Sequence, residues 1–333
     1  MCTERSHGAS KESSSHVRQS IPALVVALGC AAIAQTLPVP AHAADGIVVL
    51  KSRESPQYNE AVNGFLQKWT VQDAALPVRQ AVLGNPTDDP NMVFGTAARP
   101  AAIVAVGTDA ARWAIKNTSG LVVFCMVANA QSSLGATMSA AEKARIHGVS
   151  LDIPAMAQLQ TLGRYLTKAK RLGVIYDPRK SGAAVQEIEQ AAARLGIQVV
   201  KQEVVNESIL PDVTDGIASR VDALWAPVDS TVYNSRSAQF ILAQMLQHNV
   251  PVMGFSESMV KAGALLACQV DYQAVGAQTA ALLEALLKGN PAADDSIQAP
   301  RTYHTIINSR VQQVLGNPIP SSALREAKFV NED

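Results

Sequence analysis

Histidine and cysteine carry much of the catalysis and metal binding in proteins, and this chain offers few of them after residue 43. The histidines of that part are His147, His248 and His304, and none belongs to a His-Glu-x-x-His pair. The chain also lacks a Gly-x-Ser-x-Gly nucleophile elbow, a P-loop and a Gly-x-Gly-x-x-Gly dinucleotide fingerprint. We therefore expect a protein that is not an enzyme and that uses no cofactor and no metal.

Polar residues that follow apolar runs form a second group with useful chemistry. In parallel sheets a ligand collects outside the carboxyl ends of the strands, where loops and helix N-termini present backbone N–H groups. Applied to the apolar runs of this chain, that rule selects side chains suited to holding a small ligand by hydrogen bonds. The candidate ligand-binding residues are Ser55, Gln57, Tyr58, Thr108, Asn129, Asp229, Ser230, Thr231, Ser256 and Glu257.

Each candidate also has an ordinary structural explanation. Thr108 and Ser256 suit helix capping, and Tyr58 can simply cover the first helix. The carboxylates of Asp229 and Glu257 can receive a cationic amine of a ligand, pair with an arginine or stay solvated. We expect a protein of two lobes, in which these two carboxylates contact the ligand from opposite lobes. Neither carboxylate should be needed for folding.

Short β-branched runs alternate with amphipathic stretches along the chain, and this alternation positions the candidates. The strand candidates are residues 46–50, 78–83, 102–106, 121–126, 171–176, 197–205, 221–226, 252–254 and 303–307. Between them, apolar side chains recur at helical spacing, for example over residues 56–69 and 236–247. The pattern restarts after Gly148, so the sequence predicts an α/β protein with two doubly wound sheets.

The N-terminal segment has the order of a secretory signal peptide. Arg5, Lys11 and Arg18 precede an apolar run over residues 21–37, and the small residues Ala41-His42-Ala43 follow. The run is shorter than the roughly 20 residues of a membrane-spanning helix. Residues 1–43 are therefore predicted to be removed, which places the protein in the periplasm. Lipidation at Cys30 is the less favoured alternative.

Export also bears on the cysteines and on the charge of the protein. Cys125 and Cys268 remain after cleavage, in an oxidising compartment where they either form a disulfide or stay as buried free thiols. The apolar segments around them favour free thiols and disfavour a zinc site. Lys plus Arg and Asp plus Glu each number 28, so no basic field attracts nucleic acid.

Several segments in fixed order resemble the ABC transporter substrate-binding proteins of the group that includes tryptophan and tyrosine transporters. These segments are residues 221–232, 249–252, 256–265, 271–276, 307–309 and 315–320. The resemblance implies the type I periplasmic binding protein fold, in which two Rossmann-like lobes are joined by three crossing strands. It places the crossings near Gly148, Gly254 and Pro300. Lobe one is then residues 45–147 plus 255–299, and lobe two is residues 149–253 plus 300–333.

The resemblance also implies a function for the space between the lobes. A small organic ligand, for example an aromatic amino acid, is expected there for delivery to an ABC permease in the inner membrane by a monomeric protein. The alternative is a sensor of the same fold that signals to a membrane receptor or kinase. Residues 85–99 and Ala128-Asn129-Ala130 depart from the family pattern near the expected cleft, so the ligand can differ from that of relatives.

We predict that the exported protein begins at or next to Ala44, because the small residues before it form a signal-peptidase site. N-terminal sequencing of protein purified from the periplasm tests this. A lipid attached to Cys30, or a mature chain that keeps residues 1–43, would contradict it.

Overall fold

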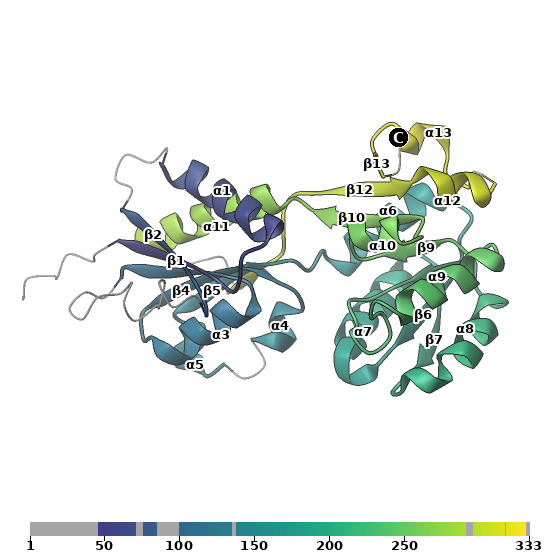
Figure 1. Cartoon of the computed structure of the whole chain (residues 1–333), viewed down its shortest axis with the longest axis horizontal. Helices are drawn as coiled ribbons and strands as arrows, with labels where there is room; N and C mark the ends of the chain where they lie inside the picture. Colours follow the sequence, from purple (N-terminus) through teal and green to yellow (C-terminus); the bar gives the residue numbers. More distant parts are fainter. Residues whose placement is uncertain are drawn as a thin grey trace, which may run out of the picture. The chain divides into compact units, whose positions relative to one another are not determined.

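The computed structural model describes residues 46–70, 76–84, 100–134, 138–290, 296–316 and 318–330. The predicted signal peptide and the family departure at residues 85–99 lie outside these described residues. Helices and strands alternate along the described chain and gather into two sheets (Figure 1). Within these ranges, no helix has both the length and the apolar character needed to cross a membrane.

The first sheet joins six strands of the described chain, all parallel, in the order β11-β5-β4-β3-β1-β2. The strands are β1 (Ile47–Lys51), β2 (Val78–Val82), β3 (Ala102–Val106), β4 (Leu121–Val127), β5 (Ile146–Ser150) and β11 (Ile297–Gln298). The helices around it are α1 (Pro56–Thr70), α3 (Thr108–Asn117), α4 (Ala130–Ser133), α5 (Ala140–Lys143) and α11 (Tyr272–Leu287). Every residue of β1 and β3 is buried because helices cover both faces of this sheet.

The second sheet, again counting described residues, has seven strands in the order β13-β12-β10-β9-β8-β6-β7. The strands are β6 (Arg171–Tyr176), β7 (Gln198–Glu203), β8 (Ala223–Trp225), β9 (Val252–Gly254), β10 (Leu266–Val270), β12 (Tyr303–Asn308) and β13 (Lys328–Val330). The helices are α6 (Ala155–Tyr165), α7 (Pro178–Arg194), the 3-10 turn η3 (Glu207–Ile209), α8 (Leu210–Ala218), α9 (Ser237–Gln247), α10 (Glu257–Lys261), α12 (Ser309–Val314) and α13 (Ser321–Leu324). β10 and β12 pair antiparallel, and the other pairs are parallel. The predicted α/β class with two doubly wound sheets is therefore confirmed.

The positions at which the chain passes from one sheet to the other differ from the predicted crossings at one boundary. It leaves the first sheet after Ser150, returns after Val270 and leaves again between β11 and β12. The predicted crossing at Gly254 is wrong, because β10 pairs with β9 in the second sheet. The short helix α10 connects β9 to β10, and both strands belong to the second sheet. Residues 255–270 therefore belong to lobe two.

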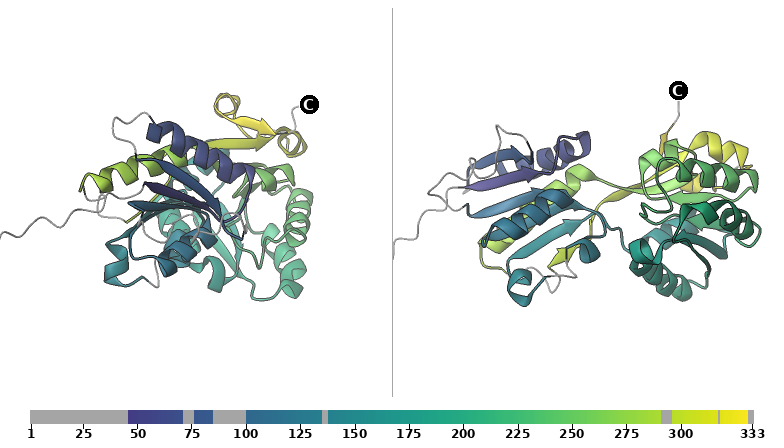
Figure 2. Two further views of the ribbon diagram at one scale, coloured as in Figure 1. Left: turned by 60° about the vertical axis from the view of Figure 1, so that its left-hand side comes forward. Right: turned by 60° about the horizontal axis from the view of Figure 1, so that its bottom comes forward.

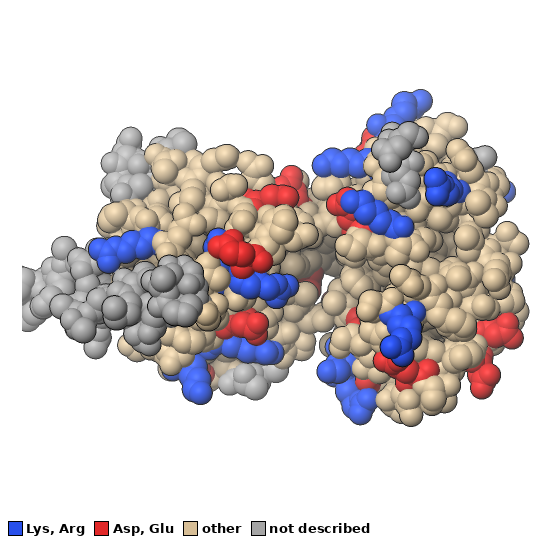
Figure 3. Space-filling view, viewed as in Figure 1, with Lys and Arg blue, Asp and Glu red and all other residues tan. Residues whose placement is uncertain are grey.

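Charged side chains of both signs are interspersed over the face shown in Figure 3. This distribution agrees with the equal numbers of basic and acidic residues in the chain, 28 of each. The visible face therefore carries no broad basic surface of the kind that binds a phosphate backbone.

Helix α11 is joined to the first sheet through a close contact with α1, although the two helices are distant in the sequence (Figures 1 and 2). A Cβ atom added at Gly276 of α11 would lie 1.8 Å from the backbone oxygen of Ala61. A Cβ atom at Gly64 of α1 would lie 1.9 Å from the backbone oxygen of Gln273. The two backbones are thus in direct contact, and only glycine permits this spacing.

We expect Gly276→Ala to lower the free energy of unfolding by about 1–3 kcal/mol or more, because the helices must move apart to admit a methyl group. Urea denaturation measures this change. Gly216→Ala is the matched control, since Gly216 lies inside helix α8 and a Cβ atom there meets nothing within 4 Å. That control should leave stability unchanged or raise it by up to about 1 kcal/mol. Equal stability of the two variants would contradict the described packing.

Candidate ligand-binding site

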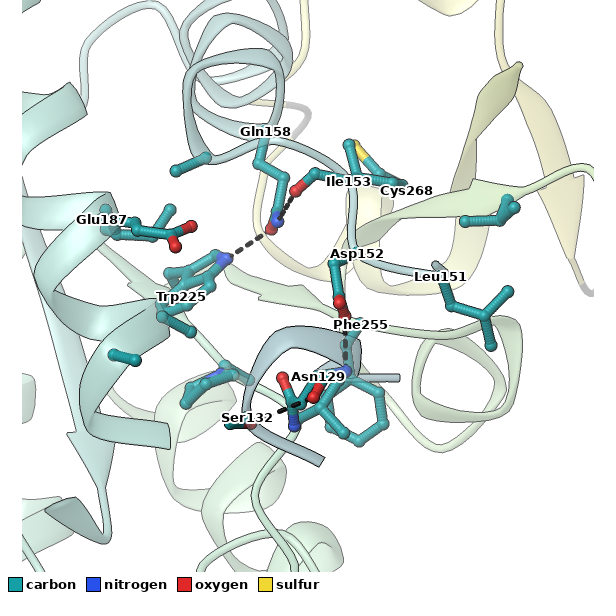
Figure 4. A pocket seen from close by; sticks show the side chains of 18 of the residues that line it. Asn129, Ser132, Leu151, Asp152, Ile153, Gln158, Glu187, Trp225, Phe255 and Cys268 are labelled. Atoms are coloured by element: carbon teal, nitrogen blue, oxygen red, sulfur yellow. Dashed lines mark hydrogen bonds between the residues drawn. The ribbon is translucent and has the colours of Figure 1, made fainter. Parts of the chain in front are cut away.

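A pocket of about 400 Å³ is lined by loops and helices that belong to both sheets (Figure 4). The first sheet contributes the turn after β4 and the segment after β5. The second contributes helices α6 and α7 and residues at the ends of β8, β9 and β10. Ligand pockets commonly measure roughly 300–1,000 Å³, so the cavity has room for a small organic molecule.

Trp225, the last residue of β8, forms one wall of the pocket in a defined orientation. Its indole Nε1 donates a hydrogen bond to Oε1 of Gln158 at 2.8 Å. The amide Nε2 of Gln158 in turn donates to the backbone oxygen of Ile153 at 2.7 Å. This chain of hydrogen bonds, drawn in Figure 4, holds both the indole and the amide of Gln158 against rotation.

Phe255, which follows β9, supplies a second aromatic side chain to the lining. Its ring packs edge-on against Tyr233, with ring centroids 6.4 Å apart and an interplanar angle of 71°. Tyr233 is buried and outside the pocket lining, so it supports Phe255 from behind. The pocket therefore offers two aromatic groups, each held by a neighbour.

Asp152 ties the turn after β4 to the segment that leaves the first sheet. One carboxylate oxygen accepts a hydrogen bond from the backbone N–H of Asn129 at 2.7 Å, and the other accepts from that of Ala130 at 2.9 Å. Burial raises the pKa of Asp152, and the two N–H donors act in the opposite direction. Asn129 adopts a left-handed backbone with φ of 49°, a conformation that asparagine tolerates. The N–H groups of Asn129 and Ala130 are thus already satisfied by the protein itself.

Comparison with known proteins identifies the family. The model of the family described as ABC transporter substrate binding protein matches residues 83–331. This chain belongs to that family.

Relatives of the substrate-binding family share the fold at low sequence identity. A tyrosine-binding protein from Clostridioides difficile is 24% identical over 151 residues, which cover 44% of this chain and 43% of that protein. A ligand-free, open substrate-binding protein with adhesive properties from Clostridium difficile has a TM-score of 0.70 at 18% identity, covering 87% of this chain and all of the other. An ABC domain from Streptococcus pneumoniae in complex with L-Trp has a TM-score of 0.58 at 22% identity, covering 86% and 100%.

Among the predicted ligand-binding residues, Asn129 alone lies in the lining of this substrate-binding protein's aromatic pocket. Ser55 and Tyr58 belong to the start of α1, where Ser55 Oγ accepts the backbone N–H of Tyr58 at 3.2 Å. The Tyr58 ring lies against the guanidinium of Arg53, 5.3 Å from the ring centroid. Gln57 is exposed, and Thr108 is the half-buried first residue of α3.

Ser256 and Glu257 lie at the start of α10 rather than in the aromatic pocket. Ser256 caps the helix by accepting the backbone N–H of Met259 at 3.3 Å. Glu257 pairs with Lys261 at 2.6 Å and, like Gln57, lines a second, more polar pocket of about 430 Å³. Both Glu257 and Asp229 belong to the lobe of the second sheet, so the expectation that they face a ligand from opposite lobes is wrong.

Asp229 is 2% exposed, and four protein donors satisfy its carboxylate. One oxygen accepts from the backbone N–H of Asp177 at 2.7 Å and from Ser181 Oγ at 2.6 Å. The other accepts from the backbone N–H groups of Thr231 and Val232 at 2.9 and 3.1 Å. The expected role of Asp229 in ligand binding is therefore replaced by a structural one, in which it joins the turn after β6 to the loop after β8.

Asp177 is a second buried carboxylate in this loop cluster. It pairs with Arg179 at 2.9 Å and accepts a hydrogen bond from Thr231 Oγ1 at 2.9 Å. The Arg179 guanidinium holds the pKa of Asp177 well below its usual range. Thr231 therefore serves the same cluster, while the neighbouring Ser230 is exposed and outside the pocket lining.

Five polar residues of the aromatic pocket are absent from the predicted ligand-binding residues: Gln131, Ser132, Asp152, Gln158 and Glu187. Gln131 and Ser132 lie in α4, directly after the predicted Asn129. Asp152 follows a strand in the same way as the residues that were selected, so the same rule applied after β5 would have found it. Gln158 and Glu187 lie within helices α6 and α7, where no sequence signal distinguishes a residue that faces a ligand from one that faces solvent. Their location depends on how the helices pack.

The two cysteines that the structure describes are free thiols in different sheets, Cys125 in β4 and Cys268 in β10. Burial raises the pKa of Cys125 to about 12 and that of Cys268 to about 11, so both stay protonated. Cys268 also contributes to the pocket lining. Across the described ranges, no group of three or more histidine, cysteine, aspartate or glutamate residues is arranged to hold a metal ion.

We expect Asp229→Asn to lower the free energy of unfolding by about 2–3 kcal/mol, because an amide offers one acceptor atom where the carboxylate offers two. At least one buried donor of the cluster then faces an N–H group. Urea denaturation of the ligand-free protein measures the change. Glu257→Gln is the matched control, since its ion pair with Lys261 is partly exposed and should contribute less than about 1 kcal/mol. Equal stability of both variants would show that the Asp229 cluster contributes nothing to folding.

Proposed function

We propose that this protein is the periplasmic solute-binding component of an ABC importer and that it holds a small organic ligand in the aromatic pocket. The observation that carries this proposal is a pocket with two aromatic walls that is lined by segments of both sheets. Membership of the substrate-binding family supports it. We infer an ABC permease of the inner membrane as the partner and a monomer as the working form.

The proposed ligand is an aromatic amino acid or an organic molecule of similar size. Trp225 and Phe255 give the pocket aromatic walls on which a planar group can stack. One solved relative is described in complex with L-Trp, and one curated relative is named a tyrosine-binding protein. Asn129, Gln131 and Ser132 bring polar groups from the first sheet to the same cavity.

Ligand capture in this proposal is coupled to movement of the two lobes. The lobes are connected by the three passages of the chain, so a ligand that contacts both sets of loops stabilises a closed arrangement. A permease can then distinguish occupied from empty protein by the shape of the pair of lobes. Small-angle scattering should detect compaction when ligand is added.

Native mass spectrometry of protein purified from the periplasm tests the proposal directly. A co-purified small molecule in a one-to-one complex is the expected result, since tight binders retain their ligand. Uptake of that molecule by cells that lack the gene then separates delivery from sensing. Loss of uptake supports the importer role, and unchanged uptake would assign the protein to sensing. A protein that carries no ligand and binds none from a periplasmic extract would contradict the proposed function.

We expect Gln158→Ala to weaken binding of the co-purified ligand by about tenfold, a factor that corresponds to about 1.4 kcal/mol. The change removes the acceptor that orients Trp225. Calorimetric titration measures the dissociation constant. Gln160→Ala is the control, because Gln160 lies on the same helix but is exposed and outside the lining. Unchanged affinity in Gln158→Ala would place the ligand away from Trp225.

A further inference from the structure

Of the two charged residues in the lining of the aromatic pocket, Asp152 and Glu187, only the exposed Glu187 has no partner among the described residues. Asp152 is occupied by two backbone N–H groups, and Gln158 by Trp225 and a backbone carbonyl. Among the described residues, the Glu187 carboxylate has neither a hydrogen bond nor an ion pair. In Figure 4 its side chain extends from α7 toward Trp225 and Gln158.

The neighbouring acidic residue on the same helix shows that pairing was available. Glu189 lies two residues further along α7 and pairs with Lys201 of β7 at 2.8 Å, outside the pocket lining. Glu187 instead belongs to the lining, away from that lysine. An acidic side chain in such a place lowers the affinity for an anion and raises it for a cation.

The remaining charge of the pocket has the same sign. Its charged lining residues are Asp152 and Glu187, and no described lysine, arginine or histidine belongs to the lining. The backbone N–H groups of Asn129 and Ala130, which would suit an anion, are already bonded to Asp152. The pocket therefore combines aromatic walls with a negative charge, on Glu187, that no described residue of the lining compensates.

We propose that Glu187 determines specificity by accepting a cationic nitrogen of the ligand, which makes the ligand class an organic amine with an aromatic or apolar body. This inference rests on the proposed function of the pocket and adds the charge of the ligand to it. The ammonium group hydrogen-bonds to Glu187 while the body of the ligand lies against Trp225 and Phe255. The geometry resembles other sites in which an aromatic wall and a carboxylate bind a cation together.

Three indole compounds of nearly the same size test the charge preference by calorimetric titration at pH 7. Tryptamine is a cation, L-tryptophan a zwitterion and indole-3-propionate an anion. The wild-type protein should bind the two amines more tightly than the propionate. Glu187→Gln should weaken binding of both amines by about ten- to a hundredfold and leave the propionate unchanged or improved.

Glu189→Gln provides the matched control and should bind all three compounds as the wild type does. Melting temperatures of the ligand-free variants verify that both fold. Equal affinity of wild type and Glu187→Gln for the amines would overturn the role of Glu187. Tighter binding of the propionate than of tryptamine, or binding of none of the three, would overturn the charge assignment. In each of these cases a small molecule recovered by native mass spectrometry would still uphold the proposed function.

Discussion

The site depends on two hydrogen bonds that Asp152 accepts from the backbone of the turn after β4. They join the chain as it leaves the first sheet to a loop that brings Asn129 into the aromatic pocket. The carboxylate is substantially desolvated, so removal of its donors would leave a buried charge without compensation. The turn and the segment after β5 are therefore held together as one wall, and the rest of the pocket is built against it.

Several polar groups in and near the pocket are already satisfied by the protein. The amide of Gln158 is held between Trp225 and the backbone of Ile153, and the carboxylate of Asp229 is enclosed by four donors. Groups of this kind give the walls a fixed geometry, which reduces the entropy lost when a ligand binds. A group without a partner, such as Glu187, is where the protein can gain a new interaction. Rigid walls and an unsatisfied, charged acceptor are features that a selective binding site requires.

Carboxylates at the ends of strands join neighbouring segments of the chain in this fold. Asp177 and Asp229 face each other's loops and connect the turn after β6 to the loop after β8. Asp152 connects a turn to the segment between the sheets. In each case the backbone N–H groups at the end of a strand need an acceptor, and the protein supplies one from a neighbouring loop. In the proposed function, a ligand contacts the positions where no such internal partner is present.

The sequence by itself determined the alternation of strands and helices, the presence of two sheets and the resemblance to the substrate-binding family. These follow from the local periodicity of apolar residues and from family-like segments in a fixed order, both of which can be recognised in the sequence. The assignment of β10 to the second sheet was decided by the tertiary structure, because an apolar strand can pair with either sheet. The structural role of Asp229 and the unpartnered state of Glu187 were decided there as well. Both depend on which loops and helix faces meet across long sequence separations. Local sequence patterns do not determine such long-range contacts.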